Sequence, residues 1–334
     1  MPNRCLVRGS INIDEFFHVH DIVRPGETIS SSGLEKRAGG KGANQAVAVA
    51  RAGAAVDLVA AVGNDGLWVR ELLMRSQVNV DSVAVVDDST GRAIIQLSQE
   101  GENSIILFKG ANYSAVHKEN PPTMHPEVTH ILLQNEIPFA DTLAQLESSS
   151  HPSLPRPIAT IFNPSPMPTA EELRILPWKN LTWLVVNEGE AEDLSAALTF
   201  DSSIVRPPPN DAPYASMSAY PVVMRLAQCI PTTNIVCTLG GAGVLAHVPA
   251  LEGAPVYLPA AVLEAVRDTT GAGDCFTGYM VDGLMKLGEA ALTRESLTAI
   301  LKRSVQAAGM CVERRGAMES IPAGHEVDAR LALR

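Results

Sequence analysis

The sequence predicts an α/β fold, a three-layer sandwich in which helices flank a mostly parallel central sheet, with a small second sheet. Three observations predict it. The chain opens with a strand, a helix and another strand, which is a β-α-β unit. After residue 125, near-continuous apolar runs alternate with helical stretches, as parallel strands buried on both faces do. Segments of alternating polarity interrupt this rhythm and predict a small sheet of their own.

The elements follow in chain order. The opening unit has strands at 6–9 and 56–62 and a helix over 43–52. The small sheet is expected from four segments, which are 16–20, 28–35, 92–97 and 104–108. The later buried strands are expected at 129–134, 158–163, 182–187 and 234–239. Their carboxyl ends carry polar residues, and ligands of open α/β sheets bind at such ends, so one cleft is expected to collect them.

The chain is expected to form one domain over residues 1–334. The small sheet is drawn from about 14–38 and 91–109. With 334 residues and 46% hydrophobic side chains, the chain can bury a large core. The segment 200–218 is rich in Pro and Ser, with three consecutive prolines, and is predicted to be a surface insertion without regular structure.

Composition limits the partners and the compartment. The net charge is −11, from 26 basic and 37 acidic side chains, which argues against a nucleic-acid or acidic-membrane partner. Five cysteines without C-x-x-C spacing indicate reduced thiols rather than a disulfide framework. We find no signal peptide and no apolar run of membrane-spanning length. A cytoplasmic location is expected, with the nucleus also open in a eukaryote.

The segment 268–274 contains the most informative chemistry of the chain. Gly271, Ala272 and Gly273 let backbone amides approach an anion at the start of a predicted helix, where the helix dipole favours negative charge. An ionised Asp274 would repel a phosphate there, but it suits a base directed at a hydroxyl nucleophile. Taken alone, a turn that merely starts a helix explains the segment equally well.

A second motif, at 39–46, changes that balance. Its glycines allow close backbone approach, and Lys41 and Asn44 supply hydrogen-bond donors and an acceptor, a set that suits a polyhydroxylated molecule. Further upstream, Asn12 and Asp14 lie two residues apart, so in an extended segment they share a face and can bracket adjacent hydroxyls. A turn after the first strand is the alternative for that pair.

In this order, the motifs at 8–14, 39–46, 187–190 and 268–274 resemble those of the PfkB-type carbohydrate kinases, and within that family the ribokinase group. The resemblance runs from about Cys5 to Pro322. It implies the ribokinase-like three-layer fold, with the small sheet as a lid over the sugar and two lids clasped into a homodimer. It also implies ATP-dependent phosphorylation of D-ribose at the 5-hydroxyl, which yields ribose 5-phosphate and ADP.

The resemblance also implies roles for individual residues. The sugar-binding residues would be Asn12, Asp14, Gly40, Lys41, Asn44, Glu136 and the catalytic base Asp274. The anion hole would be Gly271, Ala272 and Gly273. The ATP-binding residues would be Asn187, Thr238, Gly240, Gly243 and Gly273. Mg²⁺ would be held through water by Asn187 and Glu190. An activating K⁺ would lie among Asp268, Thr270, Cys311, Arg314, Gly316 and Ser320.

Alternatives remain for the activity and for single residues. Another kinase of the family could act on adenosine or a different sugar, although an aromatic content of 4% gives an adenosine pocket little support. A non-catalytic sugar-binding protein would keep the fold without turnover. Glu190 could simply cap a helix, and Glu136 could be a surface carboxylate. The chain has no G-x-x-x-x-G-K-[ST] sequence, which excludes a P-loop kinase.

Overall fold

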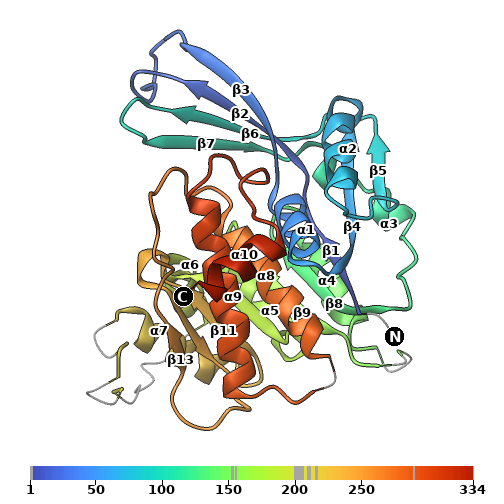
Figure 1. Ribbon diagram of the computed structural model, residues 1–334. Helices are drawn as coiled ribbons and strands as arrows, with labels where there is room; N and C mark the ends of the chain where they lie inside the picture. The colour runs from blue at the N-terminus through green and yellow to red at the C-terminus, as the bar shows by residue number, and fades with distance from the viewer. Residues whose placement is uncertain are drawn as a thin grey trace.

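The computed structural model describes residues 3–151, 154, 156–198, 207–208, 212–214, 217–288 and 290–333. Within these ranges the chain forms a nine-stranded sheet and a separate four-stranded sheet, which stands at one end of the larger body (Figure 1). The α/β fold with a large, mostly parallel sheet and a smaller separate sheet is therefore confirmed. Most of the segment predicted as an insertion, 200–218, lies outside the described residues.

The large sheet is parallel except at one edge. Its strands, in spatial order, are β13 (Val256–Leu258), β12 (Val244–His247), β11 (Asn234–Thr238), β10 (Trp183–Asn187), β9 (Ala159–Asn163), β8 (Val128–Gln134), β1 (Arg4–Arg8), β4 (Ala55–Gly63) and β5 (Val83–Val86). Only β12 and β13 run antiparallel to their neighbours. Strand β1 lies between β4 and β8, with Val7 opposite Leu58 and Leu132. The predicted buried strands correspond to β1, β4 and β8 to β11.

Helices cover both faces of this sheet (Figure 1). One face packs against α1 (Lys41–Ala52), α2 (Leu67–Arg75), α8 (Ala272–Leu287), α9 (Arg294–Val312) and α10 (Gly324–Ala332). The other packs against α4 (Phe139–Ser148), α5 (Ala170–Ile175), α6 (Glu188–Leu198) and α7 (Ala219–Cys229). Shorter elements are α3 (Val116–Glu119), η1 (Asn64–Gly66), η2 (Gly110–Tyr113), η3 (Trp178–Asn180) and η4 (Gly240–Ala242). Among the described residues, no helix is both long enough and apolar enough to cross a membrane.

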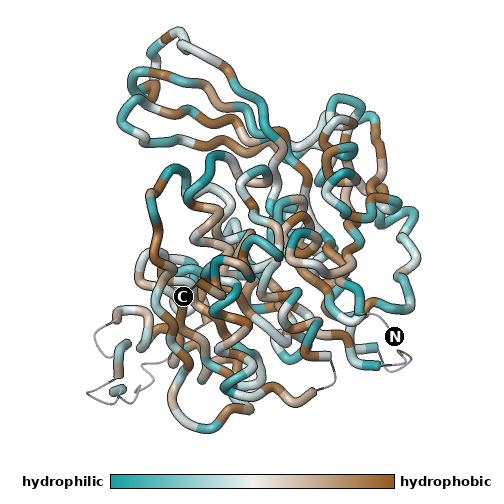
Figure 2. Tube along the Cα trace, in the orientation of Figure 1, coloured by the Kyte–Doolittle hydropathy of each residue, from teal (hydrophilic) through white to brown (hydrophobic). Residues whose placement is uncertain are grey.

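The two helical layers explain why the strands are apolar throughout. Side chains alternate across a strand, so Val185 joins the core on one face while Leu184 and Val186 join the core on the other. Both faces are covered, and neither tolerates a polar side chain without a partner. Brown, hydrophobic segments accordingly run through the body and alternate with teal, hydrophilic ones along the helices (Figure 2).

The small sheet has the order β3 (Gly33–Gly39), β2 (Asn12–His18), β6 (Gly91–Leu97) and β7 (Asn103–Phe108). The strand expected at 28–35 begins later, because β3 pairs antiparallel with β2 from Asn12 opposite Gly39 to His18 opposite Gly33. The strand expected at 16–20, in contrast, begins earlier, at Asn12. Asn12 and Asp14 therefore lie on a strand and share a face, as proposed for an extended segment, rather than in a turn.

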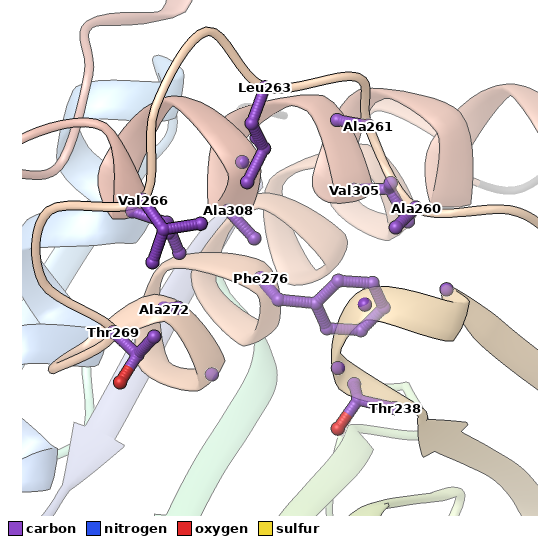
Figure 3. Close-up of a pocket in the computed structure, with 16 residues that line it drawn as sticks. Thr238, Ala260, Ala261, Leu263, Val266, Thr269, Ala272, Phe276, Val305 and Ala308 are labelled. Carbon is purple, nitrogen blue, oxygen red and sulfur yellow. The ribbon is translucent and has the colours of Figure 1, made fainter.

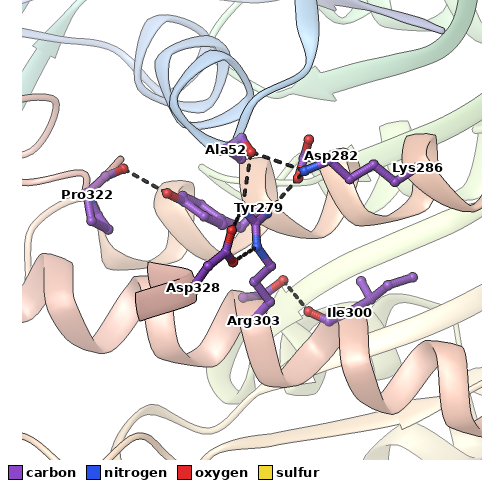
Figure 4. A network of polar contacts seen from close by, with 9 residues as sticks. Ala52, Tyr279, Asp282, Lys286, Ile300, Arg303, Pro322 and Asp328 are labelled. Atoms are coloured by element: carbon purple, nitrogen blue, oxygen red, sulfur yellow. Dashed lines mark hydrogen bonds and ion pairs between the residues drawn. The ribbon is translucent and has the colours of Figure 1, made fainter. Parts of the chain in front are cut away.

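A buried ion cluster fixes α8 against its neighbours (Figure 4). Asp282 is fully buried, and its Oδ2 accepts from Arg303 at 2.6 Å and from Lys286 at 2.7 Å. Arg303 also donates to the Ala52 carbonyl at 3.2 Å and to Asp328 at 2.7 Å. These contacts join α8 to the end of α1, to α9 and to α10, so the helix that presents Asp274 is anchored away from its functional end.

Candidate active site

The polar residues at the strand ends converge where α1 and α8 begin. Here lies a cavity of about 160 Å³. Its lining residues come from β9, β10, β11, α1, α6 and α8, and they are Lys41, Asn163, Ser165, Val185, Val186, Asn187, Glu190, Thr238, Gly271, Gly273, Asp274 and Thr277. The cleft expected at the carboxyl edge of the parallel strands is thus present.

Asp274 occupies the first turn of α8 and is only 8% exposed. Its Oδ2 accepts from Asn44 Nδ2 at 3.0 Å, and its Oδ1 accepts from Gln45 Nε2 at 2.9 Å. Both donors stand in the first turns of α1. The carboxylate is therefore held in one orientation, at the edge of the cavity, with acceptor capacity remaining on each oxygen.

The loop before Asp274 has the backbone geometry of an anion site. Gly271 has φ 77°, and a Cβ there would lie 2.9 Å from Ala317 Cα, so only glycine fits. Among the described residues, the amides of Gly271 and Gly273 donate to no protein acceptor. The Ala272 amide donates weakly to the Thr269 carbonyl at 3.3 Å. Two of the three predicted amides are thus available at a helix N-terminus, where negative charge is favoured.

Lys41 supplies positive charge to the same cavity. It begins α1 directly after Gly40, whose φ of 90° and close approach to the Asn12 amide again require glycine. Burial would lower the pKa of Lys41, but the carboxylates of Asp274, Glu136 and Glu190 raise it on balance. The ammonium therefore stays charged at neutral pH.

Glu136 supports the start of α1. Its Oε2 accepts from Ser10 Oγ at 2.5 Å and from the Lys41 amide at 2.9 Å. Burial raises the pKa of Glu136, although Lys41 and these hydrogen bonds oppose the shift. Half-buried and engaged in this way, Glu136 is not a free surface carboxylate, and its contact with a sugar stays a prediction.

Asn12 is oriented by a residue that the sequence did not reveal. Asn112 donates to Asn12 Oδ1 at 2.8 Å and accepts from the Ile11 amide at 2.9 Å. The Asn12 amide nitrogen is therefore the group left to donate to a ligand. Asn112 lies 100 residues from Asn12 in the chain, and no local pattern connects the two.

Asp14 lies beside Asn12 on β2 and is 8% exposed. Burial raises its pKa to about 7, with further contributions from Glu136, Glu319 and Asp274, while Arg37 lowers it. Among the described residues, no donor makes a hydrogen bond to this carboxylate. Asp14 is thus a buried acceptor that titrates near neutral pH.

Asn187 and Glu190 form a reciprocal pair at the start of α6. The Glu190 amide donates to Asn187 Oδ1 at 2.8 Å, and the Asn187 amide donates to Glu190 Oε2 at 3.0 Å. The capping arrangement considered from the sequence is therefore present. Both residues also line the cavity beside Lys41 and Asp274. In the described ranges no group of three or more His, Cys, Asp and Glu forms a metal cluster. The amide and carboxylate oxygens of this pair are hard donors, of the kind that Mg²⁺ takes together with several waters.

A larger cavity of about 360 Å³ adjoins the first (Figure 3). Thr238 and Gly273 line both, and the predicted ATP-binding residues Gly240 and Gly243 line the larger one. Its remaining walls are mainly apolar, and they comprise Gly241, Ala260, Ala261, Leu263, Val266, Thr269, Ala272, Phe276, Val305, Ala308, Gly309 and Val312. Such a cavity suits a flat apolar group whose charged end extends to the Gly271–Gly273 amides.

The residues predicted for K⁺ lie together beside the loop 271–273, which is predicted to bind an anion. Asp268 accepts from the Thr270 amide at 3.0 Å and from the Gly316 amide at 2.9 Å. Burial opposes the shift, but these two amides lower the pKa of Asp268 below its ordinary value. Cys311 Sγ contacts Ser320 Oγ at 2.8 Å.

Arg314 departs from this group because its guanidinium pairs with Glu326 at 2.6 Å. Its backbone stays close, since its amide donates to the Cys311 carbonyl at 3.0 Å. Backbone oxygens, Asp268 and Ser320 are hard oxygen donors, so the set is chemically compatible with an alkali cation.

Comparison with known proteins identifies the family. The family model described as pfkB family carbohydrate kinase matches residues 2–324. Ribokinase from Bacillus subtilis is 30% identical, covering 99% of this chain and 100% of its own. The crystal structure of ribokinase from Cryptococcus neoformans in complex with ADP is 49% identical, with a TM-score of 0.84 over 98% of this chain and 99% of that one. Arabidopsis thaliana ribokinase complexed with ribose and ATP is 26% identical, with a TM-score of 0.77 over 99% of each chain. The chain thus belongs to the pfkB family of carbohydrate kinases.

Proposed function

We propose that this chain is an ATP-dependent ribokinase, which phosphorylates D-ribose at its 5-hydroxyl to give ribose 5-phosphate and ADP. The observation that carries the proposal is the position of Asp274, held by two amides at the junction of a polar cavity and an apolar one. The relatives named ribokinase, one at 49% identity and over nearly full length, support ribose as the acceptor.

The residues of the chain divide the reaction between them. Asn12, Asp14, Lys41, Asn44 and Glu136 bind the sugar hydroxyls. Asp274 accepts the proton of the primary hydroxyl as its oxygen attacks the γ-phosphorus in line.

The nucleotide end is assigned to the glycine loops. Gly271, Ala272 and Gly273 offer amides to the phosphoryl oxygens as charge develops. Asn187, Thr238, Gly240 and Gly243 hold the nucleotide, with its base in the apolar cavity. Orientation and electrostatics supply most of the rate enhancement in phosphoryl transfer of this kind.

Two cations complete the proposal. Mg²⁺, held through water by Asn187 and Glu190, would neutralise charge on the phosphoryl oxygens. K⁺ would occupy the group around Asp268, where it would favour the loop conformation that exposes the Gly271 and Gly273 amides. Activity measured in matched KCl and NaCl, with Asp268→Asn as the variant, tests that second assignment. Equal activity of the wild-type chain in both salts would contradict it.

The small sheet is proposed as the lid of one domain that spans residues 1–334. A cavity of about 500 Å³ separates its inner face from residues 266–270. Strand β7 leaves Ile105, Ile106, Leu107 and Phe108 exposed, and an exposed apolar edge strand calls for a partner. A homodimer formed through this lid, in the cytoplasm, would bury them.

The decisive experiment is ADP release by the purified chain with Mg²⁺ and K⁺, with ribose compared against adenosine, fructose and no acceptor. Asp274→Asn is the control. Ribose-dependent release that is lost in the variant is expected. Turnover only with adenosine or fructose would move the proposed substrate but keep the reaction class. No turnover with any acceptor would favour a sugar-binding protein without activity.

A further inference from the structure

A chain of side-chain amides leads from β10 to Asp274. Asn163 Nδ2 donates to the Val185 carbonyl at 3.0 Å, and Asn163 Oδ1 accepts from Gln45 Nε2 at 3.1 Å. Gln45 Oε1 accepts from Gln134 Nε2 at 2.6 Å, and Gln45 Nε2 donates to Asp274 Oδ1 at 2.9 Å. Gln45 and Gln134 are both fully buried.

The direction of every bond in this chain is fixed by the first. A backbone carbonyl only accepts, so Asn163 must turn its amide nitrogen toward Val185 and its oxygen toward Gln45. Gln45 must then turn its nitrogen toward Asn163, which places the same nitrogen against Asp274. The reversed orientation of Gln45 would bring its oxygen against two other acceptors, and would also break the bond from Gln134.

The arrangement does not look optimised for stability. Within the described part of the chain, Gln134 Oε1 is buried and has no hydrogen-bond partner. It packs so tightly that a Cβ on Gly9 would lie 2.2 Å from it. A buried acceptor left unpaired costs free energy, and an apolar side chain of similar volume would avoid that cost. The amide is better explained by its effect on Gln45.

We propose that Gln45 is a positioning residue for the reaction, fixed by Gln134 and Asn163 so that its amide always donates to Asp274. The inference rests on the proposed function, in which Asp274 is the general base. Asn44 donates to the other carboxylate oxygen, so the two donors from α1 together block rotation of the carboxylate. Gln45 does not line either cavity, and it reaches the polar one only through its bonds to Asp274 and Asn163.

The test is the kinetics of Gln45→Met, which keeps the volume of the side chain and removes its donor. We expect kcat to fall about 10- to 100-fold, the range for losing one hydrogen bond to a charged group. The KM values for ribose and ATP should stay within about threefold, since the lost interaction is with the base and not with substrate.

Two further variants separate positioning from folding. Gln134→Met removes the bond that orients Gln45 but leaves Asp274 untouched, so a smaller fall in kcat with unchanged KM values is expected. Asn79→Leu is the matched control, because Asn79 also donates a side-chain amide to a buried carboxylate, Asp57 Oδ1 at 3.0 Å, near the amino end of β4. It should lower the melting temperature without changing kcat.

The outcomes distinguish this inference from the proposed function. An active wild-type chain beside a Gln45→Met variant with unchanged kcat would overturn the inference alone. So would KM values for ribose or ATP that rise as much as kcat falls, or a fall in kcat that follows the melting temperature equally in the Gln45 and Asn79 variants. A wild-type chain that phosphorylates no acceptor would overturn the proposed function and this inference together.

Discussion

We expect ribose binding to weaken as the pH falls from 8 to 6, because the proposed sugar-binding face contains a carboxylate, Asp14, that titrates near neutrality. Burial, then the nearby carboxylates, raise the pKa of Asp14 to about 7. Only the ionised form accepts a hydrogen bond on both oxygens from sugar hydroxyls. Protonation therefore removes acceptor capacity from the site.

The size of the effect follows from that pKa of about 7 for Asp14. The carboxyl is then about 90% ionised at pH 8 and about 10% ionised at pH 6. If only the ionised form binds, the Kd for ribose should rise about tenfold over this range, equivalent to about 1.4 kcal/mol. Two oppositely charged neighbours also act on the pKa of Asp14, since Glu319 raises it and Arg37 lowers it. Removing either charge should therefore shift the pH dependence of ribose binding in a known direction.

Calorimetric titration with ribose alone measures this Kd without the chemical step. Asp14→Asn should bind ribose more weakly at pH 8 and show a nearly flat Kd between pH 6 and 8. Glu319→Gln removes an exposed like charge, so its curve should move to lower pH, and Arg37→Met should move it to higher pH. A wild-type Kd that is constant within twofold, or full pH dependence retained in Asp14→Asn, would refute the reasoning.

Three other substitutions test separate parts of the molecule. Asp274→Asn keeps the shape of the side chain but should lower kcat about 10²- to 10⁴-fold in the ADP-release assay. The melting temperature should be unchanged. An unchanged kcat would exclude this carboxylate as the base. Phe276→Ala removes an aromatic wall of the larger cavity and should raise the KM for ATP about tenfold, while an equal rise for ribose would argue against a nucleotide there. Asp282→Ala leaves Arg303 and Lys286 without their shared carboxylate. Urea unfolding should then show that the free energy of unfolding falls by about 3 kcal/mol, with kcat retained. A fall below about 1 kcal/mol would mean that the cluster contributes little to stability.

The strands of the large sheet were predictable because their burial is a local property of the sequence. Residues such as Leu184 to Val186 face two cores in alternation, so every position is apolar and the run is unmistakable. The small sheet gave a weaker signal. The bounds of β3 depend on its pairing with β2, which a polarity pattern from 28 to 35 does not encode.

The candidate site likewise contains residues that a local sequence pattern predicts and residues that it does not. Glycines next to an aspartate in the sequence, as at 268–274, form a recognisable motif. The structure places this motif at the start of α8, as expected. Phe276 and Val305 were missed because an apolar residue that lines a cavity has the same helical spacing as one in the core. Gln45 and Gln134 were missed because their bond joins residues 89 positions apart. The Arg314 amide donates to the Cys311 carbonyl, but its side chain turns away to Glu326, and its role beside K⁺ stays a prediction.

The distribution of charge in the cleft explains why phosphate is assigned to backbone amides and not to a cluster of cations. Lys41 is surrounded by Asp274, Glu136 and Glu190, which together raise its pKa and also outnumber it. This excess of negative charge favours a ligand that donates hydroxyl hydrogen bonds and disfavours an anion. Among the described residues the Gly271 and Gly273 amides at the start of α8 have no acceptor, and they would attract a phosphate without adding a titratable group beside Asp274. A net charge of −11 is then compatible with ATP as a substrate, because the attraction comes from oriented dipoles in one loop rather than from the overall balance of the chain.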